Sequence, residues 1–339
     1  MGRNQIVIVT NMDDLHTDDV ILLLQERGHE VVRLNTNDIP LSTTLSLTFS
    51  DKSSVWKGSI AIHTNGRVID LEQVRSVWWR RPQRFGLPLD LSEQERAFAN
   101  DELDHALRSV WASLDCYWIS RPDAIRVATW KGNQLQRAAR LGLEVPRTLL
   151  TSDPEAVRTF YEQCGGQIVF KVMTDPFLGA PKLAQTHPEG LSEQPFITTT
   201  TLITASELAR LDSVRLVPCL FQEYIPKRLE LRVTVIGDDI FAAEIHSQEH
   251  EQARLDWRNY TLDIPYRKAT LPQDIADRCL TLVKSYGLNF SALDLILTPD
   301  GRYVFLESNP NGQFIFIEKM VPELRMTEAL ASCLIRGAN

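Results

Sequence analysis

The residues most suited to chemistry are two carboxylates and an amide near the end of the chain. Asp294 lies in one apolar run, and Glu307 and Asn309 lie in the next. Between the runs stands Thr298-Pro-Asp-Gly301, a turn sequence in which Pro presets φ and Gly tolerates a positive φ. Carboxylate and amide oxygens are the ligands that Mg²⁺ prefers. The segment therefore predicts a β-hairpin that gathers a magnesium site.

The register of this hairpin decides whether the carboxylates meet. If Leu297 faces Arg302 across the turn, then Asp294 faces Phe305, and Glu307 lies diagonally from Asp294 on the same face. A register shifted by one residue would separate the two carboxylates. A half-exposed strand explains the same pattern, because the leucines on both sides of Asp294 would occupy the opposite face. The interpretation therefore needs a nucleotide site elsewhere in the chain.

Two other segments place cations where an anion is needed. Lys171 lies inside the apolar run Ile168-Val-Phe-Lys-Val172, where a charged side chain needs an anionic partner. That partner is either an internal carboxylate or a nucleotide phosphate. Arg80 and Arg81 follow two tryptophans at the end of another predicted strand. Either the tryptophans pack between layers and both arginines are solvated, or one arginine binds a substrate carboxylate bidentately.

Composition and charge restrict the class of protein. The chain has 339 residues, an ordinary globular composition and a net charge of -8, which argues against a nucleic-acid or membrane partner. The start lacks a signal-peptide profile, and no apolar run approaches the length of a membrane span. The five cysteines are widely spread without a CxxC pair, which is typical of a reducing compartment. We therefore expect a cytoplasmic protein that acts on small molecules or polypeptides.

The beginning of the chain predicts a parallel sheet. An apolar β-rich run, Gln5–Thr10, precedes a helix that starts near Thr17 and stops at Gly28. Glu30–Leu34 is a second strand, so the three elements form a βαβ unit. The unit lacks GxGxxG and hence the phosphate-cradling loop of a dinucleotide-binding fold.

The rest of the chain predicts two further units. Ser92-Glu-Gln-Glu95 is a capping box that opens a long helix, and the pattern of elements changes after residue 120. The polar stretch Pro176–Thr201 predicts a lid or peptide-binding loop. We expect an α/β (α+β) protein with domains at 1–120, 121–215 and 216–339.

From Lys131 onward, roughly the last two-thirds of the chain, the order of motifs resembles the ATP-grasp ligases. The resemblance implies an ATP-grasp fold behind an N-terminal βαβ pre-ATP-grasp domain, with ATP and Mg²⁺ as cofactors. The motifs are Lys131 before a helix, Lys171 in its strand, Gln222-Glu-Tyr-Ile225, Glu230-Leu-Arg232, Asp256-Trp-Arg258, Asp294 and Glu307-Ser-Asn309-Pro.

Carried over position by position, the resemblance gives roles to individual residues. Lys131 and Lys171 would hold the nucleotide phosphates, and Glu230 would contact the ribose. Ribosomal-protein glutamate ligases usually carry Asp at that position, so Glu230 departs from their pattern. Arg258 would lie near the transferred phosphoryl group. The hinge against the adenine would be Gln222, Glu223, Tyr224 and Ile225, and the magnesium ligands would be Asp294, Glu307 and Asn309.

A narrower resemblance is to the microviridin-type macrocyclases, the graspetide synthetases. It rests on Arg33–Asp38, Trp78-Trp-Arg-Arg-Pro82, Asp256-Trp-Arg258 and Asn309-Pro-Asn-Gly-Gln313. Such enzymes bind the leader of a ribosomal precursor peptide and join Asp or Glu side chains of its core to Ser, Thr or Lys side chains. The acid is activated as an acyl phosphate, so no enzyme nucleophile is required. Homodimers are common among similar enzymes.

The resemblance leaves two alternatives. The protein is either a macrocyclase or a ligase that adds glutamate to a peptide or a ribosomal protein. A third possibility is a non-catalytic peptide-binding protein with a vestigial ATP-grasp fold. The presence of Lys131, Lys171 and the complete set of predicted metal ligands argues against it. The sequence does not distinguish ester from amide products.

Overall fold

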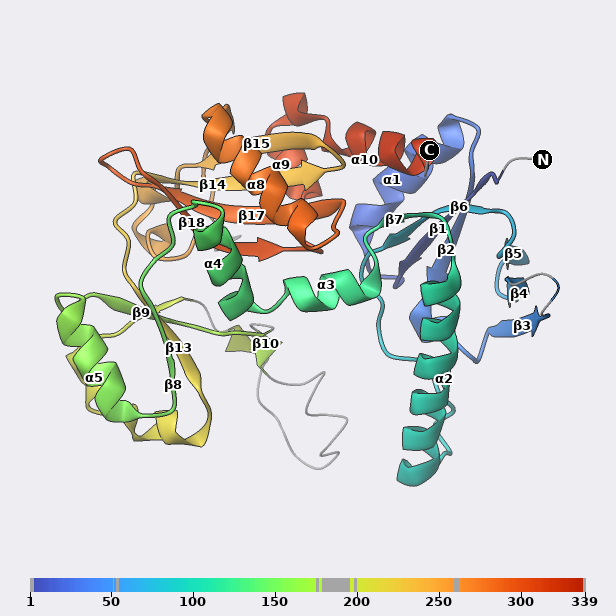
Figure 1. Cartoon of the computed structure of the whole chain (residues 1–339), viewed down its shortest axis with the longest axis horizontal. Helices are drawn as coiled ribbons and strands as arrows, with labels where there is room; N and C mark the ends of the chain where they lie inside the picture. The colour runs from blue at the N-terminus through green and yellow to red at the C-terminus, as the bar shows by residue number, and fades with distance from the viewer. Residues whose placement is uncertain are drawn as a thin grey trace.

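The structure, a computed structural model, describes residues 3–50, 52, 55–174, 177–178, 196–197, 200–258 and 262–337. These residues form an N-terminal lobe on the right of Figure 1, a central lobe at its lower left and a C-terminal lobe above. Most of the predicted loop Pro176–Thr201 lies outside the described residues. Within the described residues, no helix combines the length and apolar character needed to cross a bilayer.

The N-terminal lobe is built on the predicted parallel sheet. Its elements are β1 Gln5–Thr10, α1 Leu15–Glu26, β2 Glu30–Asn35, the 3₁₀ helix η1 Thr36–Asp38, β3 Thr43–Phe49, β4 Trp56–Ile62, β5 Arg67–Asp70, β6 Val74–Trp79, α2 Glu93–Ser113 and β7 Tyr117–Ile119. The described strands pair in the order β2-β1-β6-β7, all in parallel, and β3-β4-β5 form a smaller antiparallel sheet. The βαβ prediction is therefore confirmed.

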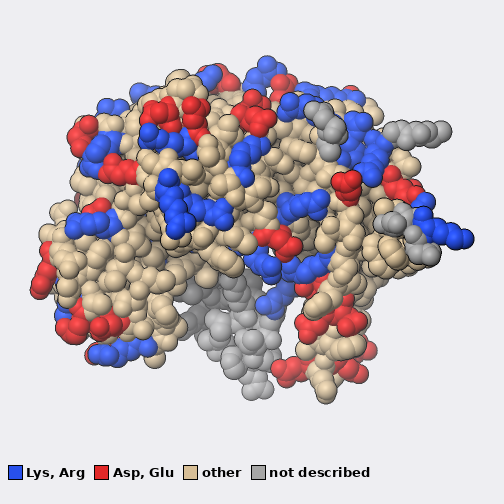
Figure 2. Space-filling view, viewed as in Figure 1, with Lys and Arg blue, Asp and Glu red and all other residues tan. Residues whose placement is uncertain are grey.

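Helix α2 begins at the predicted capping box and projects from the lobe (Figure 1). The Glu95 N–H donates to the Ser92 hydroxyl (3.3 Å), and the Ser92 N–H donates to the Glu95 carboxylate (2.9 Å). Near its C-terminal end, Leu107, Val110 and Trp111 are buried. The projecting end carries acidic side chains, as Figure 2 shows. The helix is therefore fixed at its base and presents an acidic tip.

The central lobe has its own antiparallel sheet and its own core. Its elements are β8 Thr148–Thr151, α5 Pro154–Gln163, β9 Ile168–Lys171, β10 Phe177–Leu178, β11 Phe196–Ile197, β12 Thr201–Leu202, α7 Ala205–Leu208, the 3₁₀ helix η2 Leu211–Leu216 and β13 Cys219–Glu223. The preceding helices, α3 Pro122–Ala128 and α4 Lys131–Arg140, pack instead in the core of the C-terminal lobe. The described strands pair in the order β12-β9-β13-β8, with β10 and β11 as a separate pair. Val157, Phe160, Ile168 and Phe221 belong to the core.

The C-terminal lobe is an antiparallel sheet with helices against it. Its elements are β14 Leu229–Ile236, β15 Asp239–Ile245, the 3₁₀ helices η3 Ser247–Glu249 and η4 Glu251–Ala253, β16 Tyr266–Ala269, α8 Gln273–Ser285, β17 Phe290–Leu297, β18 Tyr303–Asn309, α9 Ile315–Met320, the 3₁₀ helix η5 Pro322–Leu324 and α10 Met326–Arg336. The described strands pair in the order β16-β15-β14-β17-β18. Every residue of β17 is buried, so the half-exposed-strand interpretation is wrong.

The turn between β17 and β18 is the one that the sequence predicts. Gly301 has a φ of 90°, and its N–H donates to the Thr298 carbonyl (3.0 Å). The ladder starts one residue later than expected, because Leu297 pairs with Tyr303 and not with Arg302.

The register at the carboxylates also differs from the expected one, in which Asp294 faces Phe305. Leu306 is an extra residue in β18, and beyond it Asp294 pairs directly with Glu307. A β-bulge of this kind adds one residue to one strand only. The bulge therefore places the two carboxyl-bearing residues opposite each other instead of on a diagonal.

The last helix joins the N-terminal lobe to the C-terminal lobe. Helix α10 packs against α1 and β6 on one side and against β14 on the other (Figure 1). Leu24 of α1, Trp78 of β6, and Leu330 and Leu334 of α10 belong to the same buried cluster. The two lobes therefore share one hydrophobic core.

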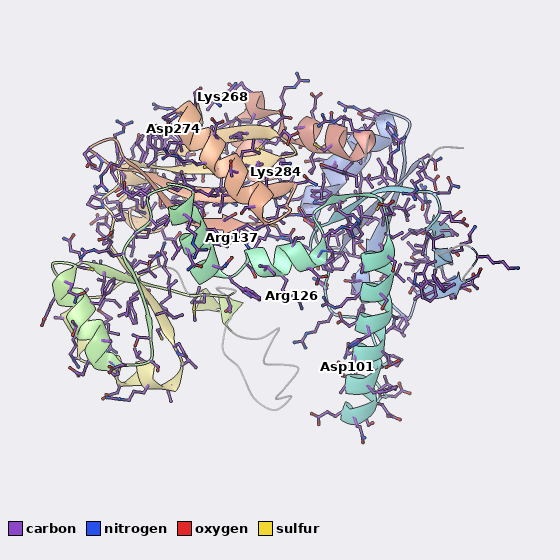
Figure 3. The ribbon with its side chains drawn as sticks, viewed as in Figure 1. Asp101, Arg126, Arg137, Lys268, Asp274 and Lys284 are labelled. Carbon is purple, nitrogen blue, oxygen red and sulfur yellow. The ribbon has the colours of Figure 1, made fainter. Side chains whose placement is uncertain are left out.

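Arg137, labelled on α4 in Figure 3, holds this helix against the C-terminal end of α8. The Arg137 guanidinium carbon lies 4.1 Å from the centre of the Tyr286 ring, and Arg137 donates to the Ser285 carbonyl (2.7 Å). At the other end of α4, the Gln134 side-chain amide donates to the Ser308 carbonyl (2.7 Å) of β18. These contacts fix the start of α4, with Lys131, beside the hairpin.

Candidate active site

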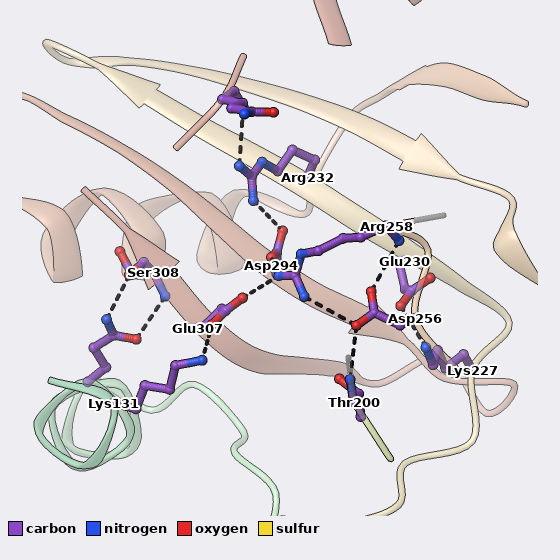
Figure 4. Close-up of polar contacts among 12 residues, drawn as sticks. Lys131, Thr200, Lys227, Glu230, Arg232, Asp256, Arg258, Asp294, Glu307 and Ser308 are labelled. Carbon is purple, nitrogen blue, oxygen red and sulfur yellow. Dashed lines mark hydrogen bonds and ion pairs between the residues drawn. The ribbon is translucent and has the colours of Figure 1, made fainter. Parts of the chain in front are cut away.

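Two carboxylates bridged by an arginine form the centre of the site (Figure 4). Arg258 Nη2 donates to both Asp294 Oδ2 (2.9 Å) and Glu307 Oε1. Asp294 Oδ1 also accepts from Arg232 Nη1 (2.7 Å), and Glu307 Oε2 accepts from Lys131 Nζ (2.7 Å). Each of the four carboxylate oxygens therefore has a cationic partner.

These cations keep Glu307 ionised inside the protein. Burial alone raises the pKa of a carboxyl, but Arg258, Lys131 and Lys171 lower the pKa of Glu307 well below its ordinary value. Lys171 shows the opposite effect. Burial lowers the pKa of Lys171 to about 8, with Lys131 and Arg258 adding to the shift and Glu307 opposing it. Lys171 is therefore a phosphate-binding candidate that loses its proton just above neutral pH.

The predicted hinge forms one wall of a cavity. Residues 222–225 line this cavity together with Lys171, Arg258, Asp294 and Glu307. The structure thus brings the predicted hinge, Lys171, Arg258 and two of the three predicted metal ligands to one cavity.

The Glu223 carboxylate within this hinge has a protein partner. It accepts from Arg147 Nε (2.6 Å) and from the Arg147 N–H (3.0 Å). Its neighbour Gln222 is buried and donates to the Thr148 hydroxyl (3.1 Å) of β8. Both side chains therefore brace the hinge against the segment that leads into β8.

Glu230, the predicted ribose contact, lies in the cavity wall with both oxygens occupied. Oε1 accepts from Lys227 Nζ (2.6 Å), and Oε2 accepts from the Ser247 hydroxyl. Burial raises the pKa of Glu230, and Lys227 opposes the shift. Lys227 also donates to the Leu255 carbonyl (2.8 Å). Lys227 and Glu230 form a buried pair, so a ribose would have to share or displace one of these bonds.

Asn309 lies two residues beyond Glu307 in β18, opposite Ala292. Its Oδ1 accepts from the Asn311 N–H (3.0 Å) and keeps a second lone pair. Among the described residues, Asn309 is not part of the cavity wall, and no three His, Cys, Asp or Glu side chains gather in metal-binding geometry. The predicted magnesium set is therefore two carboxylates and one amide, and phosphate or water oxygens must complete it.

Arg80 lies behind the cavity rather than in its wall. Its side chain is fully buried, and Nη1 donates to the carbonyls of Asn311 and Gly312 (3.0 Å to Gly312). Burial lowers the pKa of Arg80 to about 9, although Asp14, 3.5 Å away, opposes the shift. Nε and Nη2 find no hydrogen-bond acceptor within the described part of the chain. The prediction of a solvated arginine is therefore wrong for Arg80, and the carboxylate-binding role stays a prediction.

Three charged residues were not predicted as site residues: Lys227 and Asp256, which line the cavity, and Arg232, which contacts Asp294. Arg232 lies two positions beyond Glu230 in β14 and pairs directly with Asp294 of β17. The period of two in a strand could have identified Arg232 from the sequence. Lys227 lies in a connection without a regular pattern, so no local signal marks it.

Comparisons with known proteins agree with this geometry. Residues 5–126 match the family model described as the MvdD pre-ATP grasp domain. The chain is 32% identical to the macrocyclase MdnC from Microcystis aeruginosa MRC, whose crystal structure holds the precursor peptide MdnA. The match covers 98% of this chain and 99% of MdnC, with a TM-score of 0.83. A search of curated proteins returned no significant match.

Two further structures are similar over their full length. The macrocyclase MdnB from Microcystis aeruginosa MRC is 31% identical, with 98% of this chain and 99% of MdnB covered and a TM-score of 0.78. A RiPP-associated ATP-grasp ligase from Chryseobacterium gregarium, in complex with ADP and a leader and core peptide, is 29% identical. The match covers 98% of this chain and 96% of the Chryseobacterium chain, with a TM-score of 0.86.

The fold and its matches define an ATP-grasp ligase with a pre-ATP-grasp domain, as the sequence predicts. Within that class, the full-length matches to MdnC and MdnB show that the chain belongs to the family of microviridin-type ATP-grasp macrocyclases.

The lowered pKa of Lys171 predicts proton uptake on nucleotide binding. Above about pH 8 the free protein holds Lys171 mostly neutral, and a bound phosphate restores the proton, so ADP affinity should fall as pH rises further. Below that pH the lysine is already charged and no uptake is expected. Titration calorimetry with ADP in buffers of different ionisation enthalpy measures the uptake.

The matched control for this experiment is Lys171→Arg, because arginine stays charged at these pH values. The variant should bind ADP without the extra proton. The same uptake in Lys171→Arg as in the unmodified protein would assign the proton to another group.

Proposed function

We propose that the protein is an ATP-dependent peptide macrocyclase. It would activate Asp or Glu side chains of a ribosomal precursor peptide, composed of a leader and a core, and join them to Ser, Thr or Lys side chains. The observation that carries the proposal is the placement of Asp294 directly opposite Glu307, with Arg258 on Asp294 and Lys131 on Glu307. The peptide-bound structures of MdnC and of the Chryseobacterium ligase support the choice of substrate.

The charges of the site fit a magnesium-bound triphosphate. Five cations lie at the cavity and its carboxylates: Lys131, Lys171, Lys227, Arg232 and Arg258. Five carboxylates line the cavity: Glu223, Glu230, Asp256, Asp294 and Glu307. Glu223 is paired with Arg147. Apart from that neutral pair, the five cations exceed the four remaining carboxylates by one, so one divalent ion gives a net charge of about +3, which complements the phosphates of ATP. The residues present therefore fit the predicted Mg²⁺ and ATP.

Arg258 holds the place that a metal ion would take between the carboxylates. A divalent ion bound by Asp294 and Glu307 would replace the guanidinium, because both compete for the same oxygens. The released guanidinium would then be available for the transferred phosphoryl group, as predicted from the sequence. Lys131 and Lys171 would hold the neighbouring phosphate oxygens. When bound, Mg²⁺ supplies charge neutralisation and orientation of the phosphates.

The chemistry that these residues support is activation of a carboxylate by phosphorylation. A peptide carboxylate attacks the terminal phosphate of ATP and forms an acyl phosphate, with ADP as leaving group. A peptide hydroxyl or amine then attacks the acyl carbon, and inorganic phosphate leaves with its electron pair. The protein would orient both groups and stabilise charge, so no enzyme nucleophile takes part.

A peptide substrate needs surface beyond the nucleotide cavity, and the N-terminal lobe supplies one. A hollow of about 580 Å³ lies where β6 and β7 end, bounded by α2 and the start of α3. Trp79, Phe85 and Trp111 contribute apolar walls, and Asp101 and Arg121 contribute charge. Ligands of parallel α/β sheets commonly bind at the carboxyl ends of the strands. The location in the cytoplasm and a homodimer stay predictions from the sequence and the resemblance.

The decisive experiment uses the precursor peptide encoded beside the gene of this protein, with ATP and Mg²⁺. A macrocyclase gives a product lighter by one water for each crosslink, accompanied by one ADP per crosslink. Tandem mass spectrometry locates each link between an acidic side chain and a hydroxyl or amine. A product heavier by amino-acid units would establish the amino-acid-adding ligase instead. Unchanged peptide after prolonged incubation would favour the non-catalytic alternative.

Removing one metal carboxylate should abolish turnover without loss of the fold. Asp294→Asn and Glu307→Gln keep the side-chain shape but remove the charge that holds a divalent ion, so the rate should fall at least ~100-fold, about 3 kcal/mol. Peptide affinity should change little. The matched control is Asp300→Asn, an exposed acid in the turn of the same hairpin. Loss of folding in both variants would make the carboxylates structural.

Replacement of Arg80 separates peptide use from nucleotide binding. Arg80→Lys keeps a buried cation beside Asp14 but cannot bind a carboxylate bidentately. We expect a higher KM for the peptide and an unchanged ADP affinity, measured by steady-state kinetics and calorimetry. A change in ATP affinity alone would contradict the predicted role.

A further inference from the structure

The loop that carries Arg258 is fixed from two sides of the cavity. On one side, Lys227 Nζ donates to the Leu255 carbonyl (2.8 Å), which ties the loop to the segment between β13 and β14. On the other side, the Thr200 N–H of the central lobe donates to Asp256 Oδ2 (3.2 Å). Between these points, the buried Trp257 ring stacks on Phe316 of α9 at 5.8 Å. The loop therefore connects the central lobe to the C-terminal lobe.

Asp256 is the centre of this arrangement (Figure 4). Its Oδ1 accepts from the Arg258 N–H (3.1 Å), and its Oδ2 lies 3.6 Å from Arg258 Nη1. Although burial favours the neutral acid, Arg258 and the backbone N–H groups of Arg258 and Thr200 lower the pKa of Asp256. The carboxylate is therefore charged and faces Arg258 at both its backbone and its side chain.

The three carboxylates around Arg258 are not equivalent. Asp294 and Glu307 are the two that a magnesium ion would take. Asp256 is the third, and its oxygens already accept backbone N–H groups on the side of the loop. If a metal ion displaced the guanidinium from the first two, the Asp256 carboxylate would still lie beside it, as would the Trp257 ring at 5.6 Å. A long arginine side chain without such a partner would lose its orientation to solvent.

We propose that Asp256 is a positioning residue that holds Arg258 toward the terminal phosphate of bound ATP and links this position to the central lobe through the Thr200 N–H. The inference deepens the proposed ATP-dependent function and rests on it. Because Asp256 acts through Arg258, its contribution should depend on the presence of both the arginine and a third phosphate.

The test compares Mg²⁺ complexes of ADP and of AMP-PNP, which carries the third phosphate, by titration calorimetry. Asp256→Ala should weaken AMP-PNP binding about tenfold, since a charge-assisted contact to that phosphate is lost, and change ADP affinity less than about twofold. Unchanged ADP affinity also shows that the variant is folded. Asp256→Asn keeps an acceptor oxygen without the charge. Its AMP-PNP affinity should therefore lie between that of the unmodified protein and that of Asp256→Ala.

A double-mutant cycle shows whether the effect passes through the arginine. In the Arg258→Ala background, Asp256→Ala should no longer change AMP-PNP affinity. Thr200→Pro removes the N–H donor and should also weaken AMP-PNP binding. Thr200→Ala keeps the donor and should bind AMP-PNP like the unmodified protein.

Several results would overturn the proposal. Equal losses of ADP and AMP-PNP affinity in Asp256→Ala would show a general structural role. A loss that persists in the Arg258→Ala background would show that Asp256 does not act through the arginine. Failure of the unmodified protein to bind either nucleotide is a separate outcome, because it would refute the proposed ATP dependence itself.

Discussion

The structure depends on keeping two carboxylates charged and adjacent inside the protein. Asp294 and Glu307 lie opposite each other on paired strands, where two like charges would repel and favour protonation. Arg232, Arg258 and Lys131 contact them directly, and the pKa of Glu307 lies well below its ordinary value. The cations come from β14, from the loop after η4 and from α4, so distant segments must converge for the pair to exist.

The geometry of the hairpin and the loop after it makes this convergence possible. The bulge at Leu306 sets the direct pairing, and the chain then turns past Asn309 close to the sheet. A Cβ at Gly312 would lie 2.4 Å from Ala292 Cβ and 2.9 Å from Arg232 Nη2, so only glycine fits between strand and arginine. Arg232 itself donates to the Gln313 carbonyl (3.1 Å). One arginine therefore orients both the Asp294 carboxylate and the loop after β18.

The sequence predicts those parts of the site that depend on local pattern. Turn chemistry predicts the position of the hairpin through Gly301, and the motif order predicts Lys171 and residues 222–225, which line one cavity, and Lys131, which contacts Glu307 of that cavity. It could not predict the bulge, because an extra residue in one strand leaves no mark in an alternation of leucines and polar residues. It also could not predict that Arg147, distant along the chain, occupies the Glu223 carboxylate. Such long-range partners depend on tertiary packing alone.

The packing also joins the N-terminal lobe to the carboxylate pair. Arg80, from the N-terminal lobe, donates to the Asn311 and Gly312 carbonyls just after β18, and the N-terminal and C-terminal lobes share the core around α10. The central lobe has a separate core around Val157 and Phe221. Residues of both the central and the C-terminal lobe line the cavity, since Lys171 comes from the first and the two carboxylates from the second. Because Arg232, Arg258 and Lys131 already contact these carboxylates, their charge is balanced in the arrangement that the structure shows.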